Sequence, residues 1–284
     1  MTILFGFVVL NYVNHQETID CVDSITCLRG DNYRIVVVDN HSPNDSYDVL
    51  RKRFAGDARI SVLQSGRNGG YSFGNNVGIA ALRRAGIVDV VIATSDTRVE
   101  DAALLDRCAA AKQAGVAVLG PYVRDPNDVP QNPMESHLSL RYIAALRLGP
   151  AWDALRYLLS RTRLRRALQI GVPDSVRSQG AGALVDVYMV HGCFLYLSEH
   201  YLSQFPLLDE DIFMYGEEDL IAYNCLRKQL RVAYDPQMRV HHRDAKSTRS
   251  GDFRNKAVVA SMRTLRAKIG FTRLVHAYLS ARRH

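Results

Sequence analysis

The sequence predicts an α/β fold in which a mostly parallel sheet is flanked by helices. Up to Gly120, short β-rich runs alternate with amphipathic helical stretches, which is the pattern of parallel strands joined by crossover helices. The length of 284 residues is enough for one large domain with embellishments. The composition, with 47% apolar and 23% charged residues, is that of an ordinary globular protein.

The strands and helices of this first half follow one another in regular order. Strands are expected at Ile3–Leu10, Arg34–Val38, Arg59–Leu63, Val88–Ala93 and Val116–Leu119. Helices are expected at Thr18–Leu28, Asp45–Phe54, Asn75–Ala85 and Asp101–Ala114. Ser42, with Asp45 three residues later, resembles a capping pair in front of the second helix.

The second half opens with an irregular connection. After Gly120, prolines at positions 121, 126, 130 and 133 interrupt the alternation, as in a long loop. A basic helical insertion is predicted at about residues 138–172, and a basic helical extension at residues 251–284. Between them, strands are expected at Leu184–Val190, Cys193–Leu197 and Val232–Tyr234, with helices at Glu199–Gln204 and Glu217–Leu230.

The cysteines and the N-terminal residues favour a cytoplasmic protein. The five cysteines are odd in number and include no CxxC pair, so neither a disulfide framework nor a zinc knuckle is expected. The first apolar run is short and has no basic leader, unlike a signal peptide. No run approaches the roughly 20 apolar residues of a spanning helix. We therefore expect a protein that is soluble or lies on a membrane surface.

Positive charge is concentrated in two segments. The net charge is +7, but residues 141–170 carry +6 and residues 239–284 carry +10, which leaves −9 for the rest of the chain. Such asymmetry favours an anionic surface or polymer as partner. Around Trp152, apolar side chains alternate with arginines, as in a helix that lies in a lipid headgroup layer or covers a cleft. A solvated surface helix is the alternative.

Polar residues gather where the predicted strands end, which is where ligands bind in an open α/β sheet. Four successive strands lead into Asn11-Tyr12, Asp39-Asn40-His41-Ser42, Arg67-Asn68-Gly69-Gly70-Tyr71 and Thr94-Ser95-Asp96. Asp39 is placed to accept a hydrogen bond from a base N–H or a ribose hydroxyl, or to interact with the dipole of the next helix. The glycine cluster could let the backbone approach a ligand, although a glycine cluster taken by itself more often marks a tight connection without a ligand.

Three further positions suggest chemistry. Asp96 suits a hard cation that bridges to phosphate oxygens and offsets the charge of a departing diphosphate, although spacing alone favours a helix cap. In Glu217-Glu218-Asp219, adjacent carboxylates raise one another's proton affinity, which tunes a general base; acids in a first helical turn also simply complement the dipole. Of His241 and His242, only one can face a site if the segment is extended, as a metal ligand, a phosphate contact or a structural histidine.

Taken in this order, the motifs resemble those of glycosyltransferase family 2, specifically the rhamnosyltransferase-like branch that builds bacterial surface polysaccharides. The matching stretches span about residues 3–248. They are Val8–Tyr12, Val37–Ser42, Arg67–Tyr71 with Gly74–Gly78, Thr94–Asp96, Pro206–Glu210 through Phe213–Asp219, and Pro236–His242 with Ser247.

The resemblance implies a GT-A fold over residues 1–250, with a nucleotide-binding half at about 1–120 and an acceptor-binding, catalytic half at about 180–250. It implies inverting transfer of a sugar, such as rhamnose from dTDP-rhamnose, to a polysaccharide or lipid-linked acceptor in O-antigen or capsule biosynthesis. The donor is a nucleoside-diphosphate sugar, and the cofactor is a divalent cation, magnesium or manganese. The enzyme would act in the cytoplasm, peripherally at the inner face of the cell membrane, with the basic helices contacting the membrane surface.

The resemblance also assigns roles to individual residues. The donor would be bound by Asn11, Tyr12, Asp39, Asn40, Arg67, Asn68, Gly69, Gly70, Asn75 and Ser95, and the metal by Asp96 and His242. The base would be one of Glu217, Glu218 and Asp219. Glu218 is favoured, because it stands where the aspartate of a Gly-Glu-Asp pattern would. Thr94-Ser95-Asp96 stands where relatives carry Asn-Pro-Asp or Asp-x-Asp, which implies weaker metal binding or help from another group.

Three alternatives remain open. A nucleotidyltransferase would carry a basic phosphate loop near its N-terminus, but the first 28 residues contain neither Lys nor Arg. A polyanion-binding module fits the isoelectric point of 9.2, yet the sequence lacks an aromatic-basic recognition motif, so no nucleic-acid partner is expected. A nucleotide-sugar-binding homologue without transferase activity is the third. A homo-oligomer is neither indicated nor excluded.

Overall fold

The computed structural model describes residues 3–133 and 184–243, together with Ala260 and Thr264. The strands are β1 (Phe5–Asn11), β2 (Tyr33–Asp39), β3 (Ile60–Gln64), β4 (Asp89–Thr94), β5 (Thr97–Val99), β6 (Val116–Arg124), β7 (Val185–Asp186), β8 (Phe194–Leu197) and β9 (Arg231–His242). The helices are α1 (His15–Thr26), α2 (Ser46–Phe54), α3 (Gly70–Arg84), α4 (Leu104–Gln113), α8 (Glu199–Leu202) and α9 (Glu217–Arg227).

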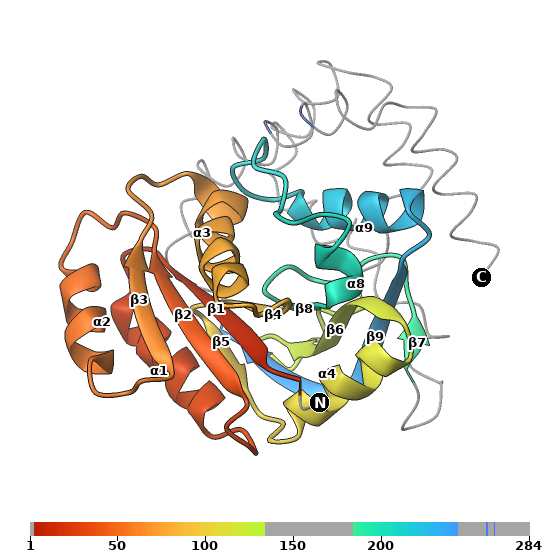
Figure 1. The fold of residues 1–284 in the computed structure, drawn as a ribbon, viewed down its shortest axis with the longest axis horizontal. Helices are drawn as coiled ribbons and strands as arrows, with labels where there is room; N and C mark the ends of the chain where they lie inside the picture. The colour runs from red at the N-terminus through yellow and green to blue at the C-terminus, as the bar shows by residue number, and fades with distance from the viewer. Residues whose placement is uncertain (1–2, 134–183, 244–259, 261–263, 265–284) are drawn as a thin grey trace.

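Within the described residues, all strands belong to one sheet with the order β3-β2-β1-β4-β8-β6-β9-β5, and β7 pairs with β9. Strands β3, β2, β1 and β4 are parallel, whereas β8 runs antiparallel to both β4 and β6. Strands β6 and β9 are again parallel. Helices cover both faces of the sheet (Figure 1), which confirms the predicted α/β fold.

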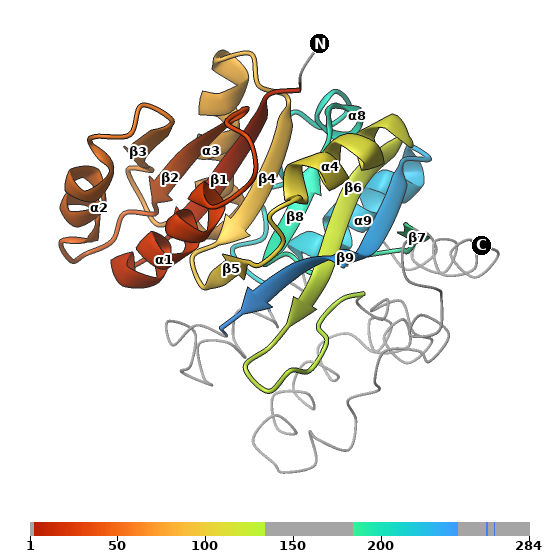
Figure 2. The ribbon, with the colours of Figure 1, turned by 90° about the horizontal axis from the view of Figure 1, so that it is seen from below.

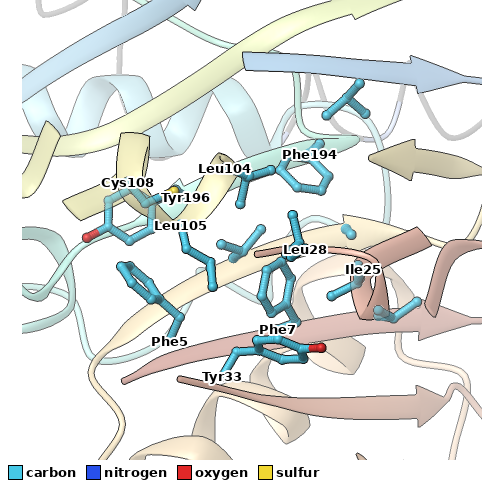
Figure 3. Close-up of a cluster of buried hydrophobic side chains, with 14 of the residues drawn as sticks. Phe5, Phe7, Ile25, Leu28, Tyr33, Leu104, Leu105, Cys108, Phe194 and Tyr196 are labelled. Carbon is cyan, nitrogen blue, oxygen red and sulfur yellow. The ribbon is translucent and has the colours of Figure 1, made fainter. Parts of the chain in front are cut away.

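The core consists of one hydrophobic layer on each face of the sheet. Along β1, Phe5 and Phe7 belong to one layer and Val8 to the other, because successive side chains of a strand point to opposite faces. Helices α1, α2 and α4 cover the first layer, whose aromatic and aliphatic side chains Figure 3 shows between the sheet and the helices. Helices α3, α8 and α9 cover the second layer.

Glycines allow α3 to lie close to the parallel strands. A side chain on Gly78 would collide with Val8 and approach Val38, and one on Gly74 would collide with Leu10. The helix therefore fits directly over β1 and β2. Its N-terminus consequently sits at the carboxyl ends of these strands, where the polar turns gather. Figure 2 shows α3 behind the sheet, with α1 and α4 in front of it.

Several predicted boundaries were wrong, for identifiable reasons. Helix α3 begins at Gly70 rather than Asn75. Strand β6 continues through Pro121, and β9 runs for 12 residues through Pro236. Both prolines sit at a register shift between the two strands, and a bulge tolerates the missing N–H. Leu184–Val190 contains only the short β7, and β5 was not predicted at all.

The predicted capping pair was also wrong. Helix α2 has Asp45 at its N-cap without a side-chain capping bond, and the Ser42 hydroxyl donates to Asp39 Oδ1 at 2.6 Å instead. Other predictions lie outside the described residues, namely the basic insertion at 138–172, Ser247 and, apart from Ala260 and Thr264, the extension at 251–284. Among the residues that the structure describes, no helix is both long and apolar enough to cross a bilayer.

Candidate active site

The register of the parallel strands places the predicted polar residues side by side. Asn11, the last residue of β1, lies opposite Asp39 at the end of β2, and Asp39 lies opposite Gln64 at the end of β3. On the other side of β1, Leu10 lies opposite Thr94 at the end of β4. Four strands thus end on one line, as the sequence predicted, and their turns form one continuous rim.

Asp39 is held rigidly at this rim. Its Oδ1 accepts hydrogen bonds from Asn11 Nδ2 at 2.7 Å and from the Ser42 hydroxyl at 2.6 Å. Its Oδ2 accepts from the Ser42 N–H at 3.0 Å and, over a long 3.4 Å, from Gln64 Nε2. The carboxylate is fully buried, and the longest of its four hydrogen bonds comes from Gln64, which is exposed. No α2 N–H bonds this carboxylate in the described contacts, which argues against the helix-dipole alternative.

The glycine-rich turn is organised by side-chain amides. Asn40 Nδ2 donates to Asn68 Oδ1 and to the Gly70 carbonyl, both at 3.1 Å, and the Gly70 N–H donates to Asn68 Oδ1 at 3.2 Å. Gly70 has a φ of +88°, and its Cα faces the Phe213 backbone so closely that any side chain would collide. The turn therefore brings backbone against the segment that precedes α9, rather than being only a tight connection.

The remaining predicted donor residues differ in accessibility. Tyr12 is partly exposed at the end of β1, Ser95 is half-buried, and the Arg67 guanidinium lies over the Phe73 ring at 4.4 Å from its centroid. Asn75 is fully buried, and its Nδ2 donates to the Tyr71 carbonyl at 3.0 Å. Because α3 begins earlier than predicted, Asn75 lies inside the helix, so its predicted direct contact with a donor finds no exposed surface here.

Asp96 lies in the turn between β4 and β5, next to His242. Its Oδ2 is 3.2 Å from His242 Nε2, and its Oδ1 accepts a 2.6 Å hydrogen bond from the Thr94 hydroxyl. The antiparallel pairing of β5 with β9 brings Thr97 opposite His242. Asp96 does not cap a helix, as spacing alone had suggested: α4 has Ala103 at its N-cap and no side-chain capping bond, and Asp101 Oδ1 accepts the Ala103 N–H at 3.0 Å just before the helix.

The Asp96–His242 pair fits a divalent cation. Two ligands at right angles around an octahedral ion, each about 2.1 Å away, lie about 3 Å apart, close to the observed separation. His242 Nδ1 is 2.7 Å from Gln131 Oε1, so Nδ1 carries a proton and Nε2 is the nitrogen available to a metal. No group of three metal-binding side chains occurs in the described part of the chain. Further ligands would be phosphate oxygens and waters, as is usual for Mg²⁺.

The three acidic residues in the first turn of α9 differ in burial. Glu217 is buried, and its pKa is raised well above the usual value by burial and, secondly, by the charge of Glu218. Asp219 is also buried. Glu218 is half-buried, and its Oε1 accepts the Gly192 N–H at 3.1 Å. Burial thus favours the protonated form of Glu217, and Glu218 is the more accessible carboxylate.

The turn at Gly192-Cys193 connects the strand end next to the Asp96–His242 pair with the acidic cluster. The Cys193 carbonyl accepts the Thr94 N–H at 2.8 Å, whereas the Gly192 N–H bonds Glu218. Burial raises the pKa of the Cys193 thiol, and the charges of Asp96 and Glu218 raise it further, because both carboxylates lie near it. The structure therefore connects Glu218, the candidate general base, with Asp96 and His242, the candidate metal ligands, although these residues are far apart in sequence.

Three residues of this site had no assigned role in the sequence. Tyr71 belongs to the glycine-rich motif, and its hydroxyl donates to the Gly192 carbonyl at 2.5 Å. Gln131 lies in the loop after β6 and carries no recognisable signal. The His191 ring packs against the His242 ring at a tilt of 59°, with ring centroids 5.5 Å apart. Of these three residues, only Tyr71 could have been found from the sequence, because it belongs to the glycine-rich motif.

Comparisons with known proteins identify the family of the chain. The family model described as Glycosyl transferase family 2 matches residues 7–181, which is more than half of the chain. That match ends before the acidic cluster and His242. No curated protein matches the sequence.

Solved structures share the fold at low sequence identity. A structure of GalNAc-T7 with UDP, GalNAc and Mn²⁺ aligns with a TM-score of 0.61 and 12% identity, over 84% of this chain and 44% of that chain. Residues 1–349 of S. aureus TarS in complex with UDP align with a TM-score of 0.58 and 14% identity, over 98% of this chain and 70% of that chain. The chain thus spans less than half the length of the GalNAc-T7 chain, and the likeness shows a GT-A fold.

Proposed function

The chain belongs to glycosyltransferase family 2, and on that premise we propose that it is an inverting, metal-dependent glycosyltransferase. Its donor is a nucleoside-diphosphate sugar, and its acceptor is a hydroxyl of a polysaccharide or of a lipid-linked glycan. The observation that carries this proposal is the Asp96–His242 pair at 3.2 Å, joined to Glu218 through the Gly192-Cys193 turn.

In the proposed binding mode, the nucleotide lies along the rim of the four parallel strands. The 3.4 Å contact between Gln64 and Asp39 Oδ2 is near the limit of a hydrogen bond, so a base N–H can replace it at little cost. The glycine-rich turn supports the phosphates with its backbone. Asp96 and His242 hold the divalent cation, which when bound offsets the charge that develops on the departing diphosphate.

Glu218 is the proposed general base. It removes the proton from the acceptor hydroxyl while the acceptor oxygen attacks the anomeric carbon. The bond between this carbon and the diphosphate oxygen breaks on the opposite face, and its electron pair leaves with the nucleoside diphosphate. The configuration at the anomeric carbon is therefore inverted. The burial of Glu217 and its raised pKa support Glu218 in this role, because both favour a protonated Glu217 carboxyl, which cannot accept the proton.

The donor and acceptor follow from resemblance rather than from contacts. The rhamnosyltransferase-like motifs make dTDP-rhamnose the first donor to test, for O-antigen or capsule synthesis, with UDP-sugars as the comparison because both aligned structures were determined with UDP. The basic segments at 138–172 and 251–284 are proposed to hold the enzyme peripherally at the inner, cytoplasmic face of the membrane.

The decisive experiment measures binding and transfer together. UDP, dTDP and GDP, with their sugars, are added with and without Mg²⁺ or Mn²⁺, and the thermal unfolding midpoint is followed. One nucleotide should raise the midpoint, and only with the cation, because ligand binding stabilises the folded state. Glu218→Gln should bind that nucleotide normally but lower kcat for sugar transfer by at least about 100-fold. No response of the wild type to any nucleotide with metal would contradict the proposal.

A further inference from the structure

Tyr71 spans the distance from the glycine-rich turn to the acidic cluster. It is the second residue of α3 and is buried. Its backbone N–H donates to the Phe213 carbonyl at 2.8 Å, and its hydroxyl donates to the Gly192 carbonyl at 2.5 Å. One residue therefore connects the donor side of the rim with both segments that frame Glu218.

The orientation of the Gly192 carbonyl affects the position of Glu218. The two hydrogen bonds at Gly192 lie on the two peptide planes that flank its Cα: the N–H plane holds Glu218, and the carbonyl plane is held by Tyr71. Glycine rotates about its backbone bonds more freely than other residues. A Cβ here would lie 2.7 Å from Glu218 Oε1, so any other residue would displace the Glu218 carboxylate. The orientation of the N–H therefore depends on external hydrogen bonds.

Tyr71 is suited to this task because its hydroxyl stays protonated. Burial raises the pKa of the phenol well above its usual value, and the charges of Glu217 and Glu218 raise it further. The hydroxyl remains a donor to the Gly192 carbonyl at all physiological pH values. Its ring is packed in the hydrophobic layer beneath α3, which leaves the hydroxyl little freedom to choose another partner.

We propose that Tyr71 is a positioning residue, which fixes the Gly192 peptide and through it orients the Glu218 carboxylate when the donor occupies the glycine-rich turn. This inference rests on the proposed function, in which Glu218 is the base. It assigns to Tyr71 no contact with the reacting atoms. Its role is to transmit the position of the α3 N-terminus to the base.

The test compares Tyr71→Phe with Tyr33→Phe. Both variants remove one buried hydroxyl and keep the ring. Tyr33 begins β2, at the far end of the strand from Asp39, and its hydroxyl accepts a hydrogen bond from Arg59 at 2.8 Å. Tyr71→Phe should lower kcat about fivefold to tenfold, as expected for one lost hydrogen bond, while KM for the donor changes less than about twofold. Tyr33→Phe should leave both constants unchanged.

A second readout does not depend on activity. Amide hydrogen exchange of residues 190–194, followed by mass spectrometry, should be faster in Tyr71→Phe than in the wild type and in Tyr33→Phe, because the Gly192 peptide is released. Unchanged exchange in Tyr71→Phe, or unchanged kcat in an active enzyme, would overturn the inference and leave the proposed function intact. A wild type without nucleotide binding would refute the proposed function, and the exchange rates would still decide whether Tyr71 holds the turn.

Discussion

At the scale of single residues, β9 offers a matched pair of adjacent histidines. His242 is buried beside Asp96, whereas His241 lies on the other face of the strand. Because only His242 can share a cation with Asp96, the two side chains should differ sharply in function although they differ little in sequence context.

We expect His242→Ala to weaken Mn²⁺ binding by at least about 10- to 100-fold, and His241→Ala to leave it unchanged. Isothermal titration of Mn²⁺ into the protein with UDP or dTDP present measures both affinities. Equal effects of the two substitutions would show that His242 is a structural histidine, which was the alternative left open by the sequence.

The buried Glu217 should make stability depend on pH. In the unfolded chain a glutamate ionises above about pH 4.3, but in the folded protein Glu217 keeps its proton because its pKa is raised. Above this pH the folded state binds more protons than the unfolded state, so the free energy of unfolding falls as pH rises. Glu217→Gln removes this contribution, because glutamine does not ionise.

Urea unfolding at pH 5 and pH 7.5 tests this reasoning. The wild type should lose more stability between these two pH values than Glu217→Gln does. Glutamine has nearly the same shape as glutamate, so the substitution leaves the packing of α9 unchanged and removes only the ionisable group. Parallel losses in the two proteins would mean that Glu217 is ionised in the folded state.

At the scale of elements, the N-terminus of α3 joins the two halves of the protein. The Asn76 side chain exchanges two hydrogen bonds with the Leu208 backbone, at 2.8 and 2.9 Å, and its Nδ2 also donates to Glu210 at 2.7 Å. Gly70 packs directly against the Phe213 backbone. The helix that begins at the glycine-rich turn thus fixes the segment leading to α9.

Substitution of two glycines with similar φ angles distinguishes the cost of backbone strain from the cost of a steric clash. Gly66 and Gly70 have φ values of +77° and +88°, but only at Gly70 would a Cβ meet other atoms. Gly66→Ala should cost about 1 kcal/mol, the cost of a left-handed conformation for a residue with a side chain. Gly70→Ala should cost at least about 2 kcal/mol more, because the Phe213 backbone must move. Chemical denaturation measures both, and equal costs would contradict the close packing of the two segments.

At the scale of the whole molecule, charge is divided between an acidic body and two basic segments. The rim itself presents carboxylates, so the basic segments, not the site, are expected to meet an anionic surface. Each Lys or Arg near an anionic membrane contributes about 1 kcal/mol. Membrane attachment would place the site near a lipid-linked acceptor.

Flotation with anionic liposomes tests this idea on the full chain. Neutralising Arg161, Arg163, Arg165 and Arg166, which lie outside the described residues, should weaken flotation strongly, and added salt should do the same. Neutralising Arg51, Lys52 and Arg84, three exposed cations of the described body, should have little effect. Unchanged flotation after the four arginines are neutralised would contradict a role for the insertion in membrane binding.

The fold class, and the convergence of the polar turns at one edge of the sheet, could both be predicted from the sequence. Alternating strand and helix patterns depend on local periodicity, and the polar turns after Asn11, Asp39 and Thr94 follow from where the apolar runs end. Since parallel strands end at the same edge, these turns had to converge. The family motifs added the functional class.

Which side chains meet depends on strand pairing and could not be predicted from the sequence. The pairing of β5 with β9 brings His242 beside Asp96, and the register shift at the two prolines sets the length of β9. Burial, not sequence order, distinguishes Glu217, whose pKa is raised, from Glu218, and the contact between Tyr71 and Gly192 joins residues 121 apart in the chain. Such contacts depend on strand pairing and packing between distant segments, which local periodicity does not encode.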